Sequence, residues 1–131
     1  MNRPLPVTDD PDSGGFFSAA ARSAIAVCEC TQCGHTVHLP RALCDVCYAA
    51  TTWRDVTPHA RLICQTVVEM QIHPAFAVPY TVVLVELDDA PTVRLIGRLD
   101  GRHHLPPGTP MRAVFEAVGD VVVPNWVPAA P

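Results

Sequence analysis

Two short cysteine motifs, CTQCG over residues 30–34 and CDVC over residues 44–47, decide how this chain folds. Each motif holds two cysteines with two residues between them, a spacing that lets the chain turn back and point both sulfurs at one ion. Gly34, directly after the first pair, suits such a turn. The spacing therefore predicts a small zinc ribbon with one ion bound by Cys30, Cys33, Cys44 and Cys47.

We expect this ion to be structural. Four thiolates complete a tetrahedron and leave no position for water or substrate, so that metal binding stabilises the fold. Iron in a redox role is the alternative. Cys28 is left out of the ligand set because one intervening residue cannot form the same knuckle with Cys30, and His35 and His38 are expected on the surface because four cysteines suffice.

Length and composition limit what else the chain can be. Its 131 residues allow one small metal module joined to a compact β domain, and a hydrophobic content of 49% against 17% charged residues predicts a buried core. The formal charge of −4 makes nucleic acid a disfavoured partner. All nine basic residues are arginine, which excludes a lysine nucleophile.

The N-terminal region and the length of the apolar runs predict where in the cell the protein is located. No run approaches the roughly 20 apolar residues of a membrane helix, so we expect no membrane association. Residues 1–15 are rich in Pro, Gly and Asp and lack the apolar core of a secretory signal. A cytoplasmic location with reduced thiols is expected.

Composition and periodicity divide the chain into five segments. Phe16 and Phe17 open a stretch whose apolar residues recur every three or four positions, as in an amphipathic helix that docks onto the ribbon or another protein. The expected segments are a mobile leader (1–14), a docking helix (15–27), the zinc ribbon (28–56), a β barrel (57–127) and a tail (128–131).

After residue 57 the apolar residues alternate with a period of two, which predicts strands. Five are expected, over residues 62–70, 79–87, 92–99, 111–118 and 121–123. Turn-forming residues separate them and no helix of useful length intervenes, which favours an antiparallel five-stranded barrel of the OB type. The fold class is therefore mainly β, and Cys64 in the first strand is interpreted as a small core residue.

Other polar residues are weaker site candidates. Arg94, Arg98 and Arg102 lie at even spacing and could bind a ligand phosphate, although an ordinary solvated face explains them equally well. A histidine could act as a general base, but no nucleophile motif accompanies any of them, so that solvated loop positions are expected for four: His59, His73, His103 and His104.

The order of these features resembles a known family. A Phe-containing helix, a four-cysteine ribbon with Pro40 between its knuckles, Trp53 and a barrel carrying FAVPY at 76–80 follow one another from residue 16 to 126. This is similar to short proteins that join a rubredoxin-like zinc ribbon to an OB-fold and accompany thiolase-like enzymes. The resemblance implies a non-catalytic partner of an enzyme that acts on acyl-CoA. The partner would be a thiolase, an acyltransferase, a lipid-transfer-protein-like aldolase, a hydroxymethylglutaryl-CoA synthase or a MaoC-like hydratase.

The expected function is therefore that of an accessory subunit in a hetero-oligomer, with an indirect contact to acyl-CoA at most. Exposed aromatic side chains would anchor the partner. The candidates are Phe16, Phe17, Phe76, Tyr80 and Trp126. The alternatives are a single-stranded nucleic-acid-binding OB-fold protein and, with least support, an enzyme acting through Cys64 or a histidine.

Overall fold

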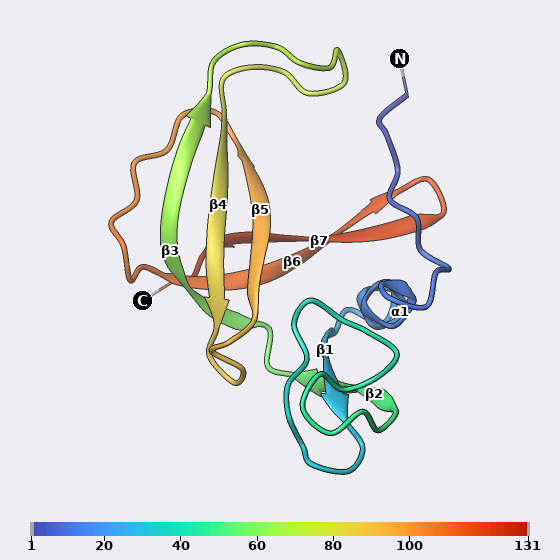
Figure 1. Ribbon diagram of the computed structural model, residues 1–131. Coiled ribbons are helices and arrows are strands. Elements are labelled where there is room, and N and C mark those ends of the chain that lie inside the picture. The colour runs from blue at the N-terminus through green and yellow to red at the C-terminus, as the bar shows by residue number, and fades with distance from the viewer. Residues whose placement is uncertain (1, 131) are drawn as a thin grey trace.

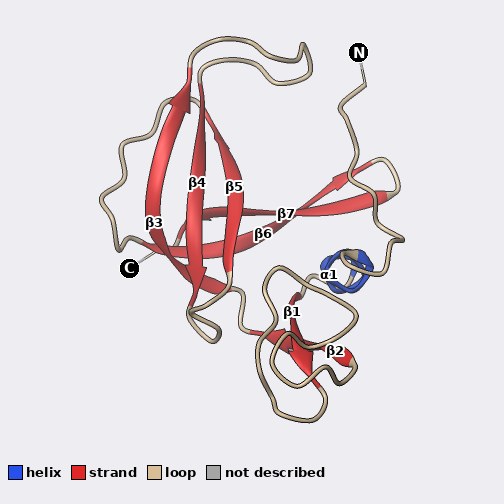
Figure 2. Cartoon of the chain, in the orientation of Figure 1, coloured by secondary structure: helices blue, strands red, loops and turns tan. Residues whose placement is uncertain are grey.

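A computed structural model describes residues 2–130, so Met1 and Pro131, at the ends of the expected leader and tail, lie outside the described residues. The fold is mainly β, with one short helix beside two β modules (Figures 1 and 2). The elements are α1 (Gly14–Ala21), β1 (Ile25–Cys30), β2 (Thr51–Val56), β3 (His59–Val68), β4 (Tyr80–Leu87), β5 (Arg94–Asp100), β6 (Pro110–Val118) and β7 (Val121–Pro128).

Helix α1 ends six residues before the expected end at residue 27. The N–H of Ser23 donates to the Ala20 carbonyl and the N–H of Ala24 donates to the Ala19 carbonyl, both at 2.9 Å, which is a Schellman termination. Ser23 takes the left-handed conformation that this motif requires, with φ of 58°. The chain then enters β1, where Val27, counted with the helix from its spacing, lies in a strand.

The five strands of the larger sheet form the expected barrel. They are ordered β5-β4-β3-β6-β7, and every hydrogen-bonded pair is antiparallel. The two end strands meet where the N–H of Arg98 donates to Asn125 Oδ1 at 2.6 Å. Gly97 permits this approach, because a Cβ there would stand 3.0 Å from the backbone nitrogen of Trp126.

A bulge in β3 corrects the expected position of Cys64. Leu62 pairs with Val85 but Cys64 pairs with Leu84, so Ile63 is an extra residue that shifts the register. Because side chains alternate between the two faces of a strand, one extra residue turns the following positions over. Leu62 is buried in the core, whereas Cys64 is exposed on the outer face and is not a core residue.

Trp126 also differs from the expectation of an exposed partner anchor. Its side chain is only 1% exposed and is the largest among the fully buried ones. It lies on β7 opposite Ala113, a small residue that leaves room for the indole inside the barrel. Trp126 therefore stabilises the barrel and is removed from the list of surface anchors.

The smaller sheet pairs β1 with β2 and carries the ribbon. Strand β1 serves two cores: Ile25 and Val27 pack with the barrel core, whereas Cys28 and Cys30 pack with Val37 inside the ribbon. The ribbon and the barrel are thus joined through a shared strand as well as through the chain that connects β2 to β3.

Candidate metal centre

The two knuckles are built by tight turns after each first cysteine. The N–H of Gly34 donates to the Cys30 carbonyl at 3.3 Å and the N–H of Tyr48 donates to the Cys44 carbonyl at 3.0 Å. Both residues have positive φ, 72° at Gly34 and 62° at Tyr48. These turns reverse the chain so that the two cysteines of each knuckle face the same point.

The four predicted cysteine sulfurs converge. The Sγ atoms of Cys30, Cys33, Cys44 and Cys47 all lie within 4.8 Å of one another. Two of the distances, Cys30 to Cys47 and Cys33 to Cys44, are 3.4 and 3.7 Å. A tetrahedral ion with metal–sulfur bonds of about 2.3 Å has its ligand sulfurs about 3.8 Å apart. The four residues can hold one metal ion.

Electrostatics around the sulfurs also fits a cation. The N–H groups of Cys33 and Gln32 point at the Cys30 sulfur and lower the pKa of that thiol to about 6. The His35 N–H acts in the same direction on Cys33, but burial and the neighbouring thiols outweigh it and raise the pKa of Cys33 to about 12. Four thiolates at such distances repel one another unless a cation neutralises them.

The neighbouring candidates stand outside the cluster. Cys28 is buried, and its sulfur lies 3.6 Å from the Arg41 carbonyl oxygen. His35 pairs with Asp45 at 3.1 Å, and His38 Nε2 lies 3.1 Å from the carbonyl of Arg94. Both histidines are exposed, as expected.

The three arginines proposed for a phosphate are each paired with a different carboxylate. Arg94 lies 4.0 Å from Glu86, Arg98 is bonded to Asp100 and Arg102 is bonded to Glu69. Each guanidinium is thus matched by a carboxylate of its own. Arg98 also lies over two aromatic rings, 5.1 Å from the centroid of Phe76 and 6.0 Å from that of Tyr80.

The remaining anchor candidates form two half-buried pairs. Phe16 and Phe17 meet edge to face in α1, with ring centroids 5.3 Å apart. Phe76 and Tyr80 lie 6.4 Å apart at the end of the loop between β3 and β4. None of the four side chains is fully exposed.

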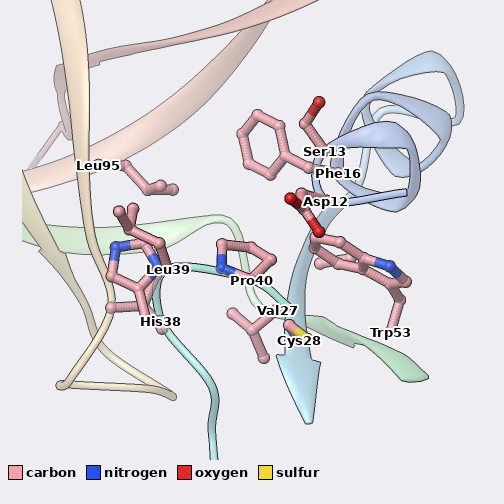
Figure 3. A pocket seen from close by; sticks show the side chains of 12 residues that line it. Asp12, Ser13, Phe16, Val27, Cys28, His38, Leu39, Pro40, Trp53 and Leu95 are labelled. Atoms are coloured by element: carbon pink, nitrogen blue, oxygen red, sulfur yellow. The ribbon is translucent and has the colours of Figure 1, made fainter. Parts of the chain in front are cut away.

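An apolar pocket between the modules was not predicted from the sequence. It has a volume of about 190 Å³ and lies between α1, the ribbon and β5. Figure 3 shows Phe16, Leu39, Pro40 and Leu95 around it, with Trp53 and Cys28 on the ribbon side. Only tertiary structure brings these distant segments together, so no local sequence pattern indicated the pocket.

Large apolar side chains are exposed on the ribbon. They lie within ten residues, before, inside and directly after the second knuckle: Leu39, Leu43, Val46 and Tyr48. Tyr48 is 75% exposed. Apolar surface concentrated in this way marks interaction sites in soluble proteins.

Among the described residues, no helix is long and apolar enough to span a bilayer.

The fold and the cysteine cluster define a protein that joins a four-cysteine ribbon to an OB-fold barrel. Residues 53–116 match the family model of the C-terminal OB-fold domain of ChsH2. This part of the chain is therefore similar to the OB-fold domain of ChsH2, and the resemblance stated from the sequence is confirmed.

Solved structures extend the likeness beyond the barrel. The chain resembles one in a structure entitled "Ltp2-ChsH2(DUF35) aldolase", with 25% identity and a TM-score of 0.83, over 98% of this chain and 100% of that one. A DUF35-family protein of unknown function from Sulfolobus solfataricus shares the fold at 16% identity and a TM-score of 0.58, over 84% and 81% of the two chains. A search of curated proteins gave no match.

Proposed function

We propose that this chain is a non-catalytic accessory subunit that binds and completes a thiolase-fold enzyme acting on acyl-CoA or acyl substrates. The observation that carries the proposal is the likeness, over essentially both whole chains, to a component of an Ltp2-ChsH2 aldolase structure. Among thiolase-fold partners, this likeness favours an aldolase that forms or cleaves carbon–carbon bonds.

The metal in this proposal is one structural zinc ion held by Cys30, Cys33, Cys44 and Cys47. Four sulfur donors favour zinc or iron over harder ions, and a closed set of four leaves no open position for chemistry. The ion would join the end of β1 to the loop before β2.

The positions of the reactive side chains support a non-catalytic role. Cys64 is exposed on β3, whereas His73 lies in the loop between β3 and β4 and accepts a hydrogen bond from the Ala75 N–H at 3.1 Å. His103 Nε2 lies 2.8 Å from the Asp100 carbonyl in another loop. Cys64 does share a surface hollow with His104, but no carboxylate among the described lining residues orients that imidazole as a catalytic base would require.

The apolar side chains of the ribbon would supply part of the contact with the partner enzyme. Interfaces between stable subunits have an apolar core with aromatic side chains, which Leu43, Val46 and Tyr48 could provide. The nucleic-acid alternative has less support, because the net charge is −4 and Arg94, Arg98 and Arg102 are each matched by a carboxylate.

Native mass spectrometry of the complex purified through a tag on this chain tests the proposal. We expect one zinc ion per chain and a stoichiometric thiolase-fold subunit. Val46→Asp should abolish co-purification of that subunit, and Ile72→Asp is the matched control because Ile72 is 76% exposed in the loop between β3 and β4. A chain that carries zinc but never retains such a subunit would disprove the accessory role.

A further inference from the structure

We propose that the leader, residues 2–13, is a strap over one face of the barrel, and that Phe76 and Glu116 form the guanidinium site to which Arg3 latches it. Arg3 Nη1 donates to Glu116 Oε1 at 2.8 Å. The guanidinium carbon of Arg3 also lies 5.3 Å from the centroid of the Phe76 ring. An ion pair and a cation–π contact on one side chain together define a site for a planar cation.

The carboxylate and the aromatic ring that contact Arg3 come from different parts of the barrel. Glu116 lies on β6, whereas Phe76 lies in the loop between β3 and β4. Arg3 bridges them, and its side chain is only 20% exposed although it stands near the chain terminus. Leu5 and Val7, the next apolar residues of the leader, are by contrast mostly exposed. Arg3 is therefore the contact that fixes this end of the strap.

A compact turn fixes the other end of the strap. Asp10 Oδ1 accepts the N–H groups of Asp12 and Ser13 at 2.8 and 2.7 Å, and Asp10 Oδ2 accepts the Ser13 hydroxyl at 2.8 Å. These bonds, with the Ser13 hydroxyl first, lower the pKa of Asp10. The turn leads directly into α1, and Figure 1 shows the leader running from there past the turn between β6 and β7. The leader, expected from the sequence to be mobile, is in this proposal a segment tied at both ends.

The strap borders a concave surface on the barrel. Arg3 lines it together with Tyr80, Ile96, Arg98 and Asn125, from strands β4, β5 and β7. β4 and β5 are the second and third strands of the barrel, the face that OB-folds use for their ligands. In the latched position Arg3 occupies the edge of that face and caps Phe76, whose ring also contacts Arg98 at 5.1 Å. Release of Arg3 would open the guanidinium site to an arginine-bearing peptide segment from another chain.

Nuclear magnetic resonance on the full chain tests the latch. We expect Arg3→Ala to reduce the heteronuclear NOE of the Leu5 and Val7 amides by more than half, to values typical of a mobile chain. Arg112→Ala is the matched control, because Arg112 is an exposed arginine on β6 with no ion pair among residues 2–130. Arg3→Lys should give an intermediate NOE, since lysine keeps the charge and loses the planar stacking.

Peptide binding tests whether the site recognises a guanidinium in trans. A synthetic peptide of residues 2–13 should bind the Arg3→Ala chain with at least tenfold higher affinity than the unaltered chain, whose site is filled by its own Arg3. The shifts of the Phe76 and Glu116 resonances during titration measure both affinities. The same peptide with alanine in place of arginine should not bind. Unchanged order of Leu5 and Val7 in Arg3→Ala, or equal peptide affinity for both chains, would overturn the proposal, and neither result depends on a partner enzyme.

Discussion

The ribbon and the barrel both consist of loops and short strands, but different kinds of core stabilise them. The ribbon buries a small cluster made mainly of cysteines, Cys28, Cys30 and Cys44 with Val37. The barrel buries a larger apolar core centred on Trp126, Leu62 and Met111. A core of cysteines needs an ion to hold it, whereas an apolar core is stabilised by removal of its side chains from water. The two regions should therefore fail under different treatments.

The largest difference should follow loss of one metal ligand. Cys44→Ser alters the proposed ligand with the least exposed side chain, 1%. Because structural zinc contributes about 10–16 kcal/mol to the folding of small zinc modules, we expect the ribbon to unfold while β3 to β7 stay folded. Hydrogen exchange should rise throughout residues 31–50 and remain slow at Val83 and Val85. Equal exchange in both regions would show that the barrel needs the metal too.

The converse change removes the largest side chain of the barrel core. Trp126→Ala should lower the free energy of unfolding by about 3–5 kcal/mol, because it leaves a cavity among well-packed neighbours. Metal content, measured by mass spectrometry on the folded fraction, should stay at one ion per chain. Loss of the metal from folded Trp126→Ala protein would contradict the separation of the two cores.

An added methyl group at the contact between the helix and the ribbon should lower the free energy of unfolding by less than Trp126→Ala does. A Cβ on Gly15 would stand 2.2 Å from Trp53 Nε1, so that Gly15→Ala must displace either α1 or the indole. We expect a cost of about 1–3 kcal/mol, typical of overpacking, and a shift in Trp53 fluorescence. Gly14→Ala is the control, since a Cβ there meets its nearest neighbour at an ordinary 3.5 Å.

The smallest effect should come from the exposed ion pair between the helix end and β2. Arg22 bonds Asp55 at 2.9 Å and, as the main cause, lowers the pKa of Asp55 below its ordinary 3.8. A carboxyl group with a lowered pKa in the folded state contributes stability above its unfolded pKa and loses it as the pH falls through the folded value. Thermal unfolding of Asp55→Asn should thus differ slightly from the parent at pH 7, and this difference should vanish in acid below the folded pKa.

The sequence predicted the features whose cause is local. Two cysteine pairs specify their turns within four or five residues. The alternation in β6, where Met111 and Ala113 are buried and Arg112 between them is exposed, reflects the inner and outer faces of the barrel directly. The features that were missed depend on distant contacts. Ser23 ends the helix in a conformation that usually selects glycine, and the bulge at Ile63 exists only in the pairing of β3 with β4. Trp126 lies near a Pro-rich tail and was predicted to be exposed, but the closed barrel buries its side chain.

The shared strand β1 has a practical consequence for dividing the molecule. A fragment beginning at Trp53, where the family match begins, would contain part of β2 without β1 and would leave unfilled the positions of Ile25 and Val27 in the barrel core. A fragment ending before β2 would leave β1 without the strand to which it is hydrogen-bonded. The chain therefore has no safe excision point between its two halves, and an expression fragment or a fusion to another protein should carry residues 25–128 as one piece.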